Sequence, residues 1–414
     1  MSLLTPDFAA ALADGVYGVN ANPLLNVQER SLLLRCEPLF SIGRPDGESS
    51  HPFARSTSGV APGGFSLLNN VPGGRRVTGL FAPVESDFGY VATGNGDWRG
   101  HMVVVTRGTM GPKGVSADWL SNFNVGLQPG PGGFPVHAGF NRIWSGFNGF
   151  VNRAIEHYRP EHIHCVGHSL GGALANLNAL MLARAGERVS LYTFGAPRVG
   201  TAAFVADLSR RLSDRVKRVY HPADPVPMIP LLPFLHAPMT GGIRLAGPAG
   251  ALVDASAHDM NASYARLVAN QSWLSLERAN TMLGDFQIDS WLQQSAQRRG
   301  GFVMRSAALL ERIAKGLARL VAKASVYVIG SGLSAAATAT LTTLDFVSWL
   351  LARASAMQAA IREEIMGLVN AIFGFMGRVA NSMVSLTQSA LRWVLDLLFD
   401  FLSNMARLAI DRLR

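Results

Sequence analysis

Short apolar stretches alternate with amphipathic ones through the middle of this chain. Four runs rich in β-branched and aromatic residues predict buried strands, at Met102–Thr106, Ile163–Val166, Val189–Phe194 and Val216–His221. Between these runs, the spacing of apolar residues predicts helices at Ala173–Ala185 and Ala202–Leu212. Regular alternation of strand and helix is typical of a mostly parallel sheet with helices on both faces. The pattern therefore predicts an α/β fold for this part of the chain.

The amino-terminal part shows weaker patterns. An apolar stretch at Phe8–Val19 predicts a first amphipathic helix that ends near Gly15 or Gly18, and Val77–Ala92 predicts a further strand. The stretch Met1–Asp7 has no basic segment and places an acidic residue before the apolar run. It therefore does not predict a secretory signal peptide.

The composition changes past about Leu276, where glycine and proline become rare and the pattern favours helices. The sequence thus divides into an α/β domain, residues 1–275, and an apolar all-helical module, residues 276–414. Residues 324–344 contain no charge and are long enough to span a bilayer, but their seven Ser and Thr residues favour a buried helix or helical hairpin. The last helix has one narrow polar stripe, and its wide apolar face must be covered by the protein, a partner or lipid. We interpret the module as membrane- or partner-associated.

The bulk composition limits the classes of function. With 48% hydrophobic and 16% charged residues, the 414-residue chain has room for one large domain and an extra module. Its formal net charge of +9 comes almost entirely from arginine, and no basic run is interleaved with aromatic residues. We therefore expect no nucleic-acid partner, and an anionic membrane surface is the electrostatic partner that the charge favours. The two cysteines, Cys36 and Cys165, predict neither a disulfide nor a metal site, and no cofactor is expected.

Candidate chemistry is concentrated at Gly167–Gly172, with the sequence GHSLGG, between a predicted strand and a predicted helix. A serine between glycines on a sharp strand-to-helix turn is the nucleophile elbow of α/β-hydrolases. Such a turn places the hydroxyl at the carboxyl end of the strand, beside a helix N-terminus that favours developing negative charge. The motif therefore predicts an α/β-hydrolase with Ser169 as its nucleophile.

A serine nucleophile needs a base that accepts its proton and an acid that orients the base, and in this fold the acid precedes the histidine along the chain. Asp224 follows the last predicted strand on a proline-bounded loop, which suits the acid. Three histidines follow Ser169, and His221 lies too close to Asp224 to reach the site on a separate loop. His236 and His258 remain, and His258 is the better candidate because it lies on a loop just before a helix.

Five blocks in this order resemble the class 3 lipases, a family named for fungal triacylglycerol lipases that also includes bacterial phospholipases. The blocks are Val103–Thr109, Asp118–Phe123, Val136–Phe140, Phe194–Gly200 and Asp224–Pro227. They resemble, in turn, the family's strand with its R-G-[ST] turn, the lid helix, the H-x-G-F block, the G-x-P-R-V-G strand end and the acid loop. The resemblance covers about Val77–Leu267, and within it His236–Ala257 follows the family less closely.

The resemblance implies a role for each of these side chains. Ser169 would be the nucleophile, Asp224 the acid and His258 the base. The backbone N–H groups of Thr109 and Leu170 would form the oxyanion hole, because one residue follows a strand end and the other begins the elbow helix.

Trp119 lies at the position of the family's lid tryptophan, so the resemblance implies a lid that opens at a lipid surface and uncovers an acyl groove. The expected activity is hydrolysis of the carboxyl esters of lipids. The positive charge and the apolar tail favour membrane phospholipids over triglycerides. An esterase acting on a soluble or polymeric ester, or a non-catalytic binding protein on the same scaffold, is the alternative.

Some bacterial relatives that have appended helices and no signal peptide are antibacterial effectors of type VI secretion. This fold-level analogy implies synthesis in a bacterial cytoplasm without a signal peptide, export by a specialised secretion system and action at membranes. It also implies an immunity or accessory protein as a partner.

Overall fold

The computed structural model describes residues 3–18, 40–41, 89–94, 96–108, 126–238, 241–247, 250–279, 285–297, 302, 304–330, 343–378 and 385–412. A seven-stranded sheet forms its centre, in the order β1-β2-β3-β6-β7-β8-β9. The strands are β1 (Phe40–Ser41), β2 (Gly89–Gly94), β3 (His101–Thr106), β6 (His162–His168), β7 (Val189–Phe194), β8 (Val216–Tyr220) and β9 (Ile243–Arg244). From β3 to β9 they pair in parallel, and β2 and β1 join in antiparallel fashion at one edge. A separate hairpin contains β4 (Leu127–Pro129) and β5 (Pro135–His137).

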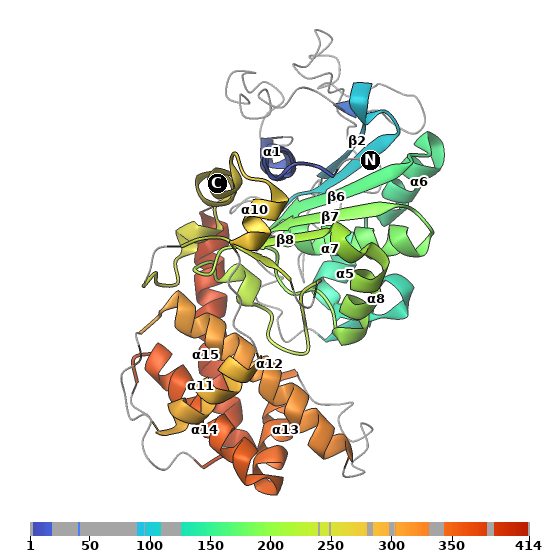
Figure 1. Cartoon of the computed structure of the whole chain (residues 1–414). Coiled ribbons are helices and arrows are strands. Elements are labelled where there is room, and N and C mark those ends of the chain that lie inside the picture. Colours follow the sequence, from blue (N-terminus) through green and yellow to red (C-terminus); the bar gives the residue numbers. More distant parts are fainter. Residues whose placement is uncertain are drawn as a thin grey trace.

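Helices cover both faces of the sheet (Figure 1). On one face α7 packs against β3, β6 and β7, and α5 and α8 pack against α7. On the other face α1 crosses the same three strands. The bounds are α1 (Pro6–Gly15), α5 (Ala138–Trp144), α6 (Asn148–Tyr158), α7 (Leu170–Arg184) and α8 (Ala202–Leu212). The predicted α/β fold with a mostly parallel sheet is confirmed.

Most predicted elements lie close to the observed ones, and the differences have local causes. The first helix begins where Thr5 accepts a hydrogen bond from the Phe8 N–H, and it ends at Gly15. Of the strand predicted at Val77–Ala92, only the part from Gly89 onward lies within the described residues. The sequence patterns did not predict α5, α6 or the two-residue strand β9.

Short helical elements follow β8 along the chain: η5 (Val226–Met228), η6 (Ala255–His258), η7 (Met260–Ala265), α9 (Arg266–Val268) and α10 (Trp273–Arg278). The described chain then continues as helices, namely α11 (Asp285–Gln297), α12 (Ala307–Gly330), α13 (Thr343–Met357), α14 (Ala359–Phe375) and α15 (Gln388–Asp411). The predicted helical C-terminal region is confirmed. Within the described ranges, no helix combines the length and apolar content that crossing a membrane requires.

The wide apolar face of the last helix is buried by the protein itself. Helix α15 packs against α13 and α14, and six apolar residues of this face are almost inaccessible to solvent: Leu391, Val394, Leu395, Leu398, Leu402 and Ala409. The sequence allowed this face to be covered by the protein, by a partner or by lipid, and in the structure other helices of the protein cover it. Residues 331–342, the centre of the uncharged stretch 324–344, lie outside the described residues.

The helical region shares one apolar core with the sheet, and polar contacts also join the two. Glu311 of α12 accepts hydrogen bonds from the Tyr220 hydroxyl at 3.0 Å and from Arg244 Nε at 3.1 Å. The Ala307 N–H donates to the carbonyl of Ala251 at 2.9 Å. In Figure 1, α15 extends from the other helices towards the sheet, where it contacts η6. The division into 1–275 and 276–414 stays a prediction, but the helices support the loops at the sheet.

We expect Glu311→Ala to lower the free energy of unfolding by about 1–3 kcal/mol, because Tyr220 and Arg244 lose a shared charged acceptor. Urea unfolding followed by circular dichroism measures this change. Glu363→Ala, on an exposed face of α14, is the matched control and should leave stability within about 0.5 kcal/mol of the wild type. Equal effects of the two substitutions would contradict a structural role for the Glu311 contacts.

Candidate active site

Ser169 lies between the end of β6 and the start of α7, with a backbone φ of 58°. Few residues with a Cβ adopt this left-handed region, and such strained residues cluster at functional sites. The turn is possible because two neighbours are glycines. A Cβ on Gly167 would collide with the carbonyl of Gly171, and a Cβ on Gly171 would collide with the carbonyl of Thr106. This close packing against β3 holds the serine at the carboxyl end of the sheet.

A chain of two hydrogen bonds joins the three residues that the sequence proposed. His258 Nε2 lies 2.8 Å from Ser169 Oγ, and His258 Nδ1 lies 2.8 Å from Asp224 Oδ2. The carboxylate only accepts, so Nδ1 carries the proton and Nε2 is left to accept the serine proton. This is the tautomer that a general base requires. All three residues are fully buried.

The Asp224 carboxylate is held by two further donors. Its Oδ1 accepts from the Val226 N–H at 2.9 Å, and its Oδ2 accepts from the Tyr264 hydroxyl at 2.6 Å. Burial and the charge of Asp224 raise the pKa of Tyr264 well above its usual value, so the phenol stays protonated and donates. The Tyr264 oxygen in turn accepts from the His221 N–H at 3.1 Å. These donors compensate the carboxylate for the water that burial removes.

His168 supports the loop that carries the base. Its Nε2 donates to the carbonyl of His258 at 2.8 Å, which leaves Nδ1 to accept from the Tyr17 hydroxyl at 2.7 Å. Burial, followed by the neighbouring His258, lowers the pKa of His168 well below its usual value. The ring is therefore a neutral link between the segment after α1 and the His258 backbone.

Only part of the predicted oxyanion hole can be described. Leu170 begins α7, so its backbone N–H is among the first N–H groups of a helix, which have no partner within the helix. Thr109, the other predicted donor, and Trp119, the predicted lid residue, both lie outside the described residues.

The competing histidines have other partners. His236 Nε2 donates to the carbonyl of Pro227 at 2.7 Å, and His221 Nδ1 accepts from the Ala223 N–H at 3.1 Å. The structure therefore brings His258 to the serine, while His236 braces the loop after the acid. His137 is buried against aromatic rings, and burial lowers its pKa to about 4.

Two residues of the site were missed from the sequence, Tyr17 and Tyr264. Tyr17 meets His168 across 151 positions of the chain, and nothing in its local sequence indicates that contact. Tyr264 lies six positions after His258 in the same segment, which was the one available hint of a shared site. Tyr264 bonds Asp224 and Tyr17 bonds His168, and neither hydroxyl meets the serine in the described hydrogen bonds.

The family model described as Lipase (class 3) matches residues 103–234. This match confirms the resemblance to the class 3 lipases that the sequence blocks carry.

Named relatives align with parts of the chain. Secreted mono- and diacylglycerol lipase 1 of Fusarium solani is 34% identical over 151 residues, which cover 35% of this chain and 43% of the relative. Secreted mono- and diacylglycerol lipase 2 of Gibberella zeae is 39% identical over 111 residues, which cover 23% of this chain and 27% of the relative. The chain thus spans less than half the length of these curated relatives. Among solved structures, the mono- and diacylglycerol lipase from Aspergillus oryzae has a TM-score of 0.39 and 21% identity, covering 59% of this chain and 79% of that chain.

These names overturn the predicted localisation. The relatives from Fusarium solani, Gibberella zeae and Malassezia globosa are named as secreted lipases, and their organisms are eukaryotes. The expectation of synthesis in a bacterial cytoplasm without a signal peptide is therefore wrong. It rested on a few residues at Met1–Asp7 and on an analogy with bacterial effectors, and neither observation carries information about the lineage of the chain.

Replacing the buried phenol tests its role at the acid. We expect Tyr264→Phe to lower kcat about tenfold with KM nearly unchanged, because one donor to the Asp224 carboxylate is lost while the substrate surface stays intact. Steady-state hydrolysis of p-nitrophenyl butyrate measures both constants. Tyr220→Phe removes another buried hydroxyl and is the control, with wild-type kcat expected. A change in KM alone would contradict the positioning role.

Asp14, at the end of α1, gives a pH-dependent prediction. Burial and the charge of Asp259 raise its pKa from 3.8 to about 6. Between these values the folded protein holds a proton that the unfolded chain releases, so this carboxyl lowers stability as the pH rises from about 4 to 6. We expect Asp14→Asn to be more stable than the wild type at pH 7, by up to about 3 kcal/mol, with the gain vanishing near pH 4.

Urea unfolding at a series of pH values from 4 to 7 measures this difference. Asp97→Asn, which changes an exposed carboxylate in the turn between β2 and β3, is the matched control. A gain for Asp14→Asn that is the same at pH 4 and pH 7 would contradict the assigned cause.

Proposed function

We propose that this protein hydrolyses carboxyl esters of lipids with Ser169 as nucleophile, His258 as general base and Asp224 as the acid that orients the base. The observation that carries the proposal is the unbroken hydrogen-bonded chain from hydroxyl to imidazole to carboxylate, with both distances at 2.8 Å. The strained backbone at the serine and the helix N-terminus behind it support the same assignment.

The geometry is suited to acyl transfer in two half-reactions, acylation of the serine and its deacylation by water. Ser169 Oγ attacks the ester carbonyl as His258 Nε2 takes its proton, and the Leu170 N–H stabilises the oxyanion that forms. The imidazolium then protonates the leaving alcohol, and the carbon–oxygen bond of the ester breaks to leave an acyl-serine. Water attacks this acyl group while His258 again accepts a proton, and return of that proton to Ser169 releases the fatty acid. Asp224 stabilises the imidazolium throughout.

Thr109 and Trp119 complete the proposal. In the family pattern Thr109 supplies the second N–H to the oxyanion, and Trp119 lies on a lid over the acyl groove. The burial of Ser169 is consistent with a site that must open before a lipid can enter.

Glycerolipids are the proposed substrate class. The named relatives are mono- and diacylglycerol lipases, which makes acylglycerol esters the first candidates. The net charge of +9 favours an anionic surface, and for that reason phospholipids are the second candidates. The named relatives are lipases and not antibacterial effectors, so neither an effector role nor an immunity partner is proposed.

Removal of the nucleophile is the direct test. We expect Ser169→Ala to lower kcat/KM for p-nitrophenyl butyrate by about 10⁴-fold or more, with circular dichroism and melting temperature close to the wild type. Ser145→Ala, at an exposed serine, should keep wild-type rates. Retained hydrolysis by the Ser169 variant would end the proposal.

The same preparations define the substrate when they are incubated with vesicles of phosphatidylcholine, phosphatidylglycerol and diacylglycerol. Mass spectrometry should show free fatty acid with the wild type and none with Ser169→Ala. Monoacylglycerol as the co-product would identify acylglycerols, and lysophospholipid would identify phospholipids. Cleavage of the soluble ester without any release from vesicles would instead favour an esterase for soluble or polymeric substrates.

A further inference from the structure

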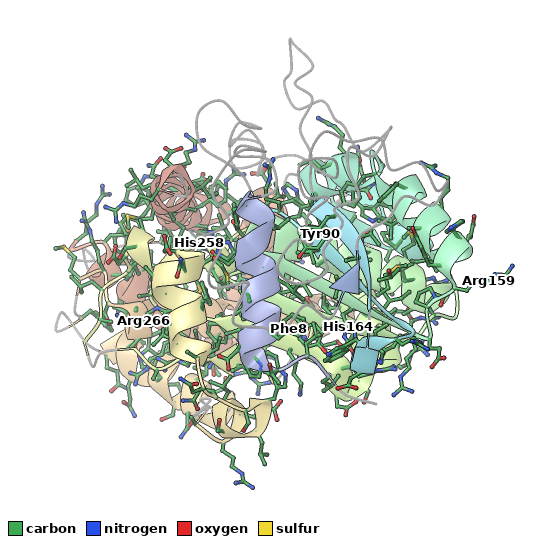
Figure 2. The ribbon with its side chains drawn as sticks, turned by 90° about the horizontal axis from the view of Figure 1, so that it is seen from above. Phe8, Tyr90, Arg159, His164, His258 and Arg266 are labelled. Carbon is green, nitrogen blue, oxygen red and sulfur yellow. The ribbon has the colours of Figure 1, made fainter. Side chains whose placement is uncertain are left out.

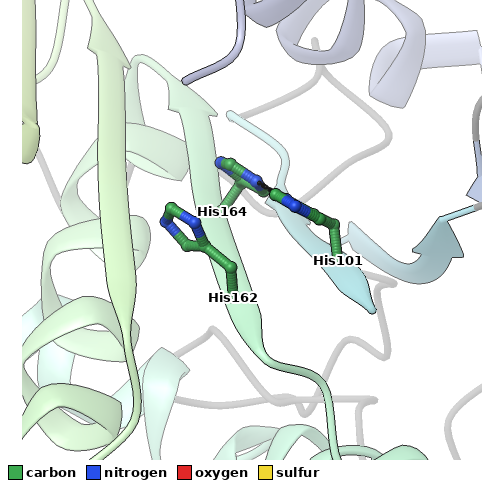
Figure 3. A group of neighbouring side chains, drawn as sticks. All are labelled: His101, His162 and His164. Atoms are coloured by element: carbon green, nitrogen blue, oxygen red, sulfur yellow. Dashed lines mark hydrogen bonds between the residues drawn. The ribbon is translucent and has the colours of Figure 1, made fainter. Parts of the chain in front are cut away.

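Three histidines meet at the end of the sheet opposite the serine. In the parallel pairing of β3 and β6, His101 is the register partner of His162, and His164 follows two positions later. Alternation along a strand directs His162 and His164 to the same face. Each of the three rings offers a nitrogen, and these nitrogens all lie within 4.8 Å of one another. Figure 3 shows the rings side by side across the two strands.

One buried nitrogen of the cluster has no hydrogen-bond partner among the described residues. His162 and His164 are almost fully buried, whereas His101 is partly exposed. His162 Nδ1 is inaccessible to solvent and makes no hydrogen bond to the described part of the chain. His101 Nδ1 and His164 Nε2 face each other at 2.9 Å and share one hydrogen bond. An orphaned buried nitrogen is costly in a folded protein, so its position next to two other imidazole nitrogens requires an explanation.

Hydroxyl groups on the next strand, β7, orient the two buried rings. Ser190 Oγ lies 2.9 Å from His162 Nε2, and the Tyr192 hydroxyl lies 3.3 Å from His164 Nδ1. Each hydroxyl forms a hydrogen bond with one nitrogen of the histidine ring, and the second nitrogen of that ring remains available within the histidine cluster. Metal-binding histidines are usually oriented in this way, by a hydrogen bond from the nitrogen that does not bind the metal.

The rings are also in the protonation state that a metal needs. Burial lowers the pKa of His162 to about 4 and the pKa of His164 well below its usual value, so both are neutral near pH 7. Burial also lowers the pKa of His101, whereas the nearby negative charge of Glu161 raises it and the positive charge of Arg188 lowers it. A neutral imidazole supplies a lone pair without first losing a proton.

We infer that His101, His162 and His164 bind one Zn²⁺ ion through His101 Nδ1, His162 Nδ1 and His164 Nε2, with the fourth position open to water on the His101 side. Three nitrogen donors suit zinc and do not suit magnesium or calcium, which prefer oxygen. Binding would replace the hydrogen bond between His101 and His164 and give the orphaned nitrogen of His162 a partner. With zinc–nitrogen bonds of about 2.0–2.1 Å, tetrahedral ligand nitrogens lie about 3.3–3.4 Å apart. The His101 and His164 nitrogens must therefore separate slightly from 2.9 Å, and the His162 nitrogen must move inward from a distance of at most 4.8 Å.

The ion would act as a clip between strands and not as part of the hydrolytic site. His162 and Ser169 lie at opposite ends of β6, about 20 Å apart at the usual rise of a strand. Figure 2 shows His258 and His164 on different sides of α1. Sequence spacing predicted no metal site because the third ring comes from β3, which meets β6 only in the folded sheet.

The test uses the full chain, stripped with EDTA and titrated with zinc chloride in a calorimeter. We expect one zinc per chain, a higher melting temperature with zinc, and X-ray absorption showing three imidazole nitrogens at about 2.0–2.1 Å. His101→Ala should weaken zinc binding by more than about tenfold and abolish the rise in melting temperature. His157→Ala, at an exposed histidine of α6, is the matched control and should bind zinc like the wild type.

Failure of the wild type to bind zinc stoichiometrically would overturn the inference, and so would equal affinity in the His101 variant. Should His101→Ala not fold, X-ray absorption of the zinc-loaded wild type still decides, because a shell without three imidazoles excludes this site. No ester is needed for these measurements. Their failure would therefore leave the proposed hydrolase intact, and an inactive hydrolase would leave the zinc site intact.

Discussion

The buried carboxylate of Asp224 imposes the constraint on which the site depends. A charge without access to water is tolerated only where donors surround it, and here the donors come from three different segments. Val226 is local, Tyr264 comes from η7, and His258 comes from the end of η6. Satisfying Asp224 therefore fixes the loop that carries the base. That loop in turn places an imidazole at the serine.

The helical C-terminal region contributes to the same arrangement from outside. The Ala307 N–H donates to the carbonyl of Ala251, in the segment that precedes His258, and α15 packs against η6. Glu311 of α12 accepts hydrogen bonds from β8 and β9. A site built on loops needs such external support, because loops have few hydrogen bonds of their own. The helices are thus better described as part of the scaffold of the proposed site than as an appendage to it.

The features that could be predicted from the sequence are those encoded by adjacent residues or by the order of residues along the chain. The turn at Ser169 is encoded by adjacent glycines, and the order of acid and histidine reduced the choice of base to His236 or His258. Contacts between distant segments could not be found in this way, and Tyr17, Tyr264 and the three clustered histidines all depend on such contacts. The apolar face of the last helix was recognised, but its pattern alone could not distinguish lipid from neighbouring helices as its cover.

The pairing of β3 with β6 links the two ends of the sheet. Near the serine, Thr106 of β3 is the register partner of Gly167 of β6, and the Thr106 hydroxyl donates to the carbonyl of Gly171 in α7. At the far end the same alignment sets His101 opposite His162. A slip of one residue would turn every side chain of one strand to the other face. An insertion within β3 would therefore shift its register against β6, which would both disrupt the elbow and separate the three imidazoles. For this reason evolution can alter neither end of this strand pair independently of the other.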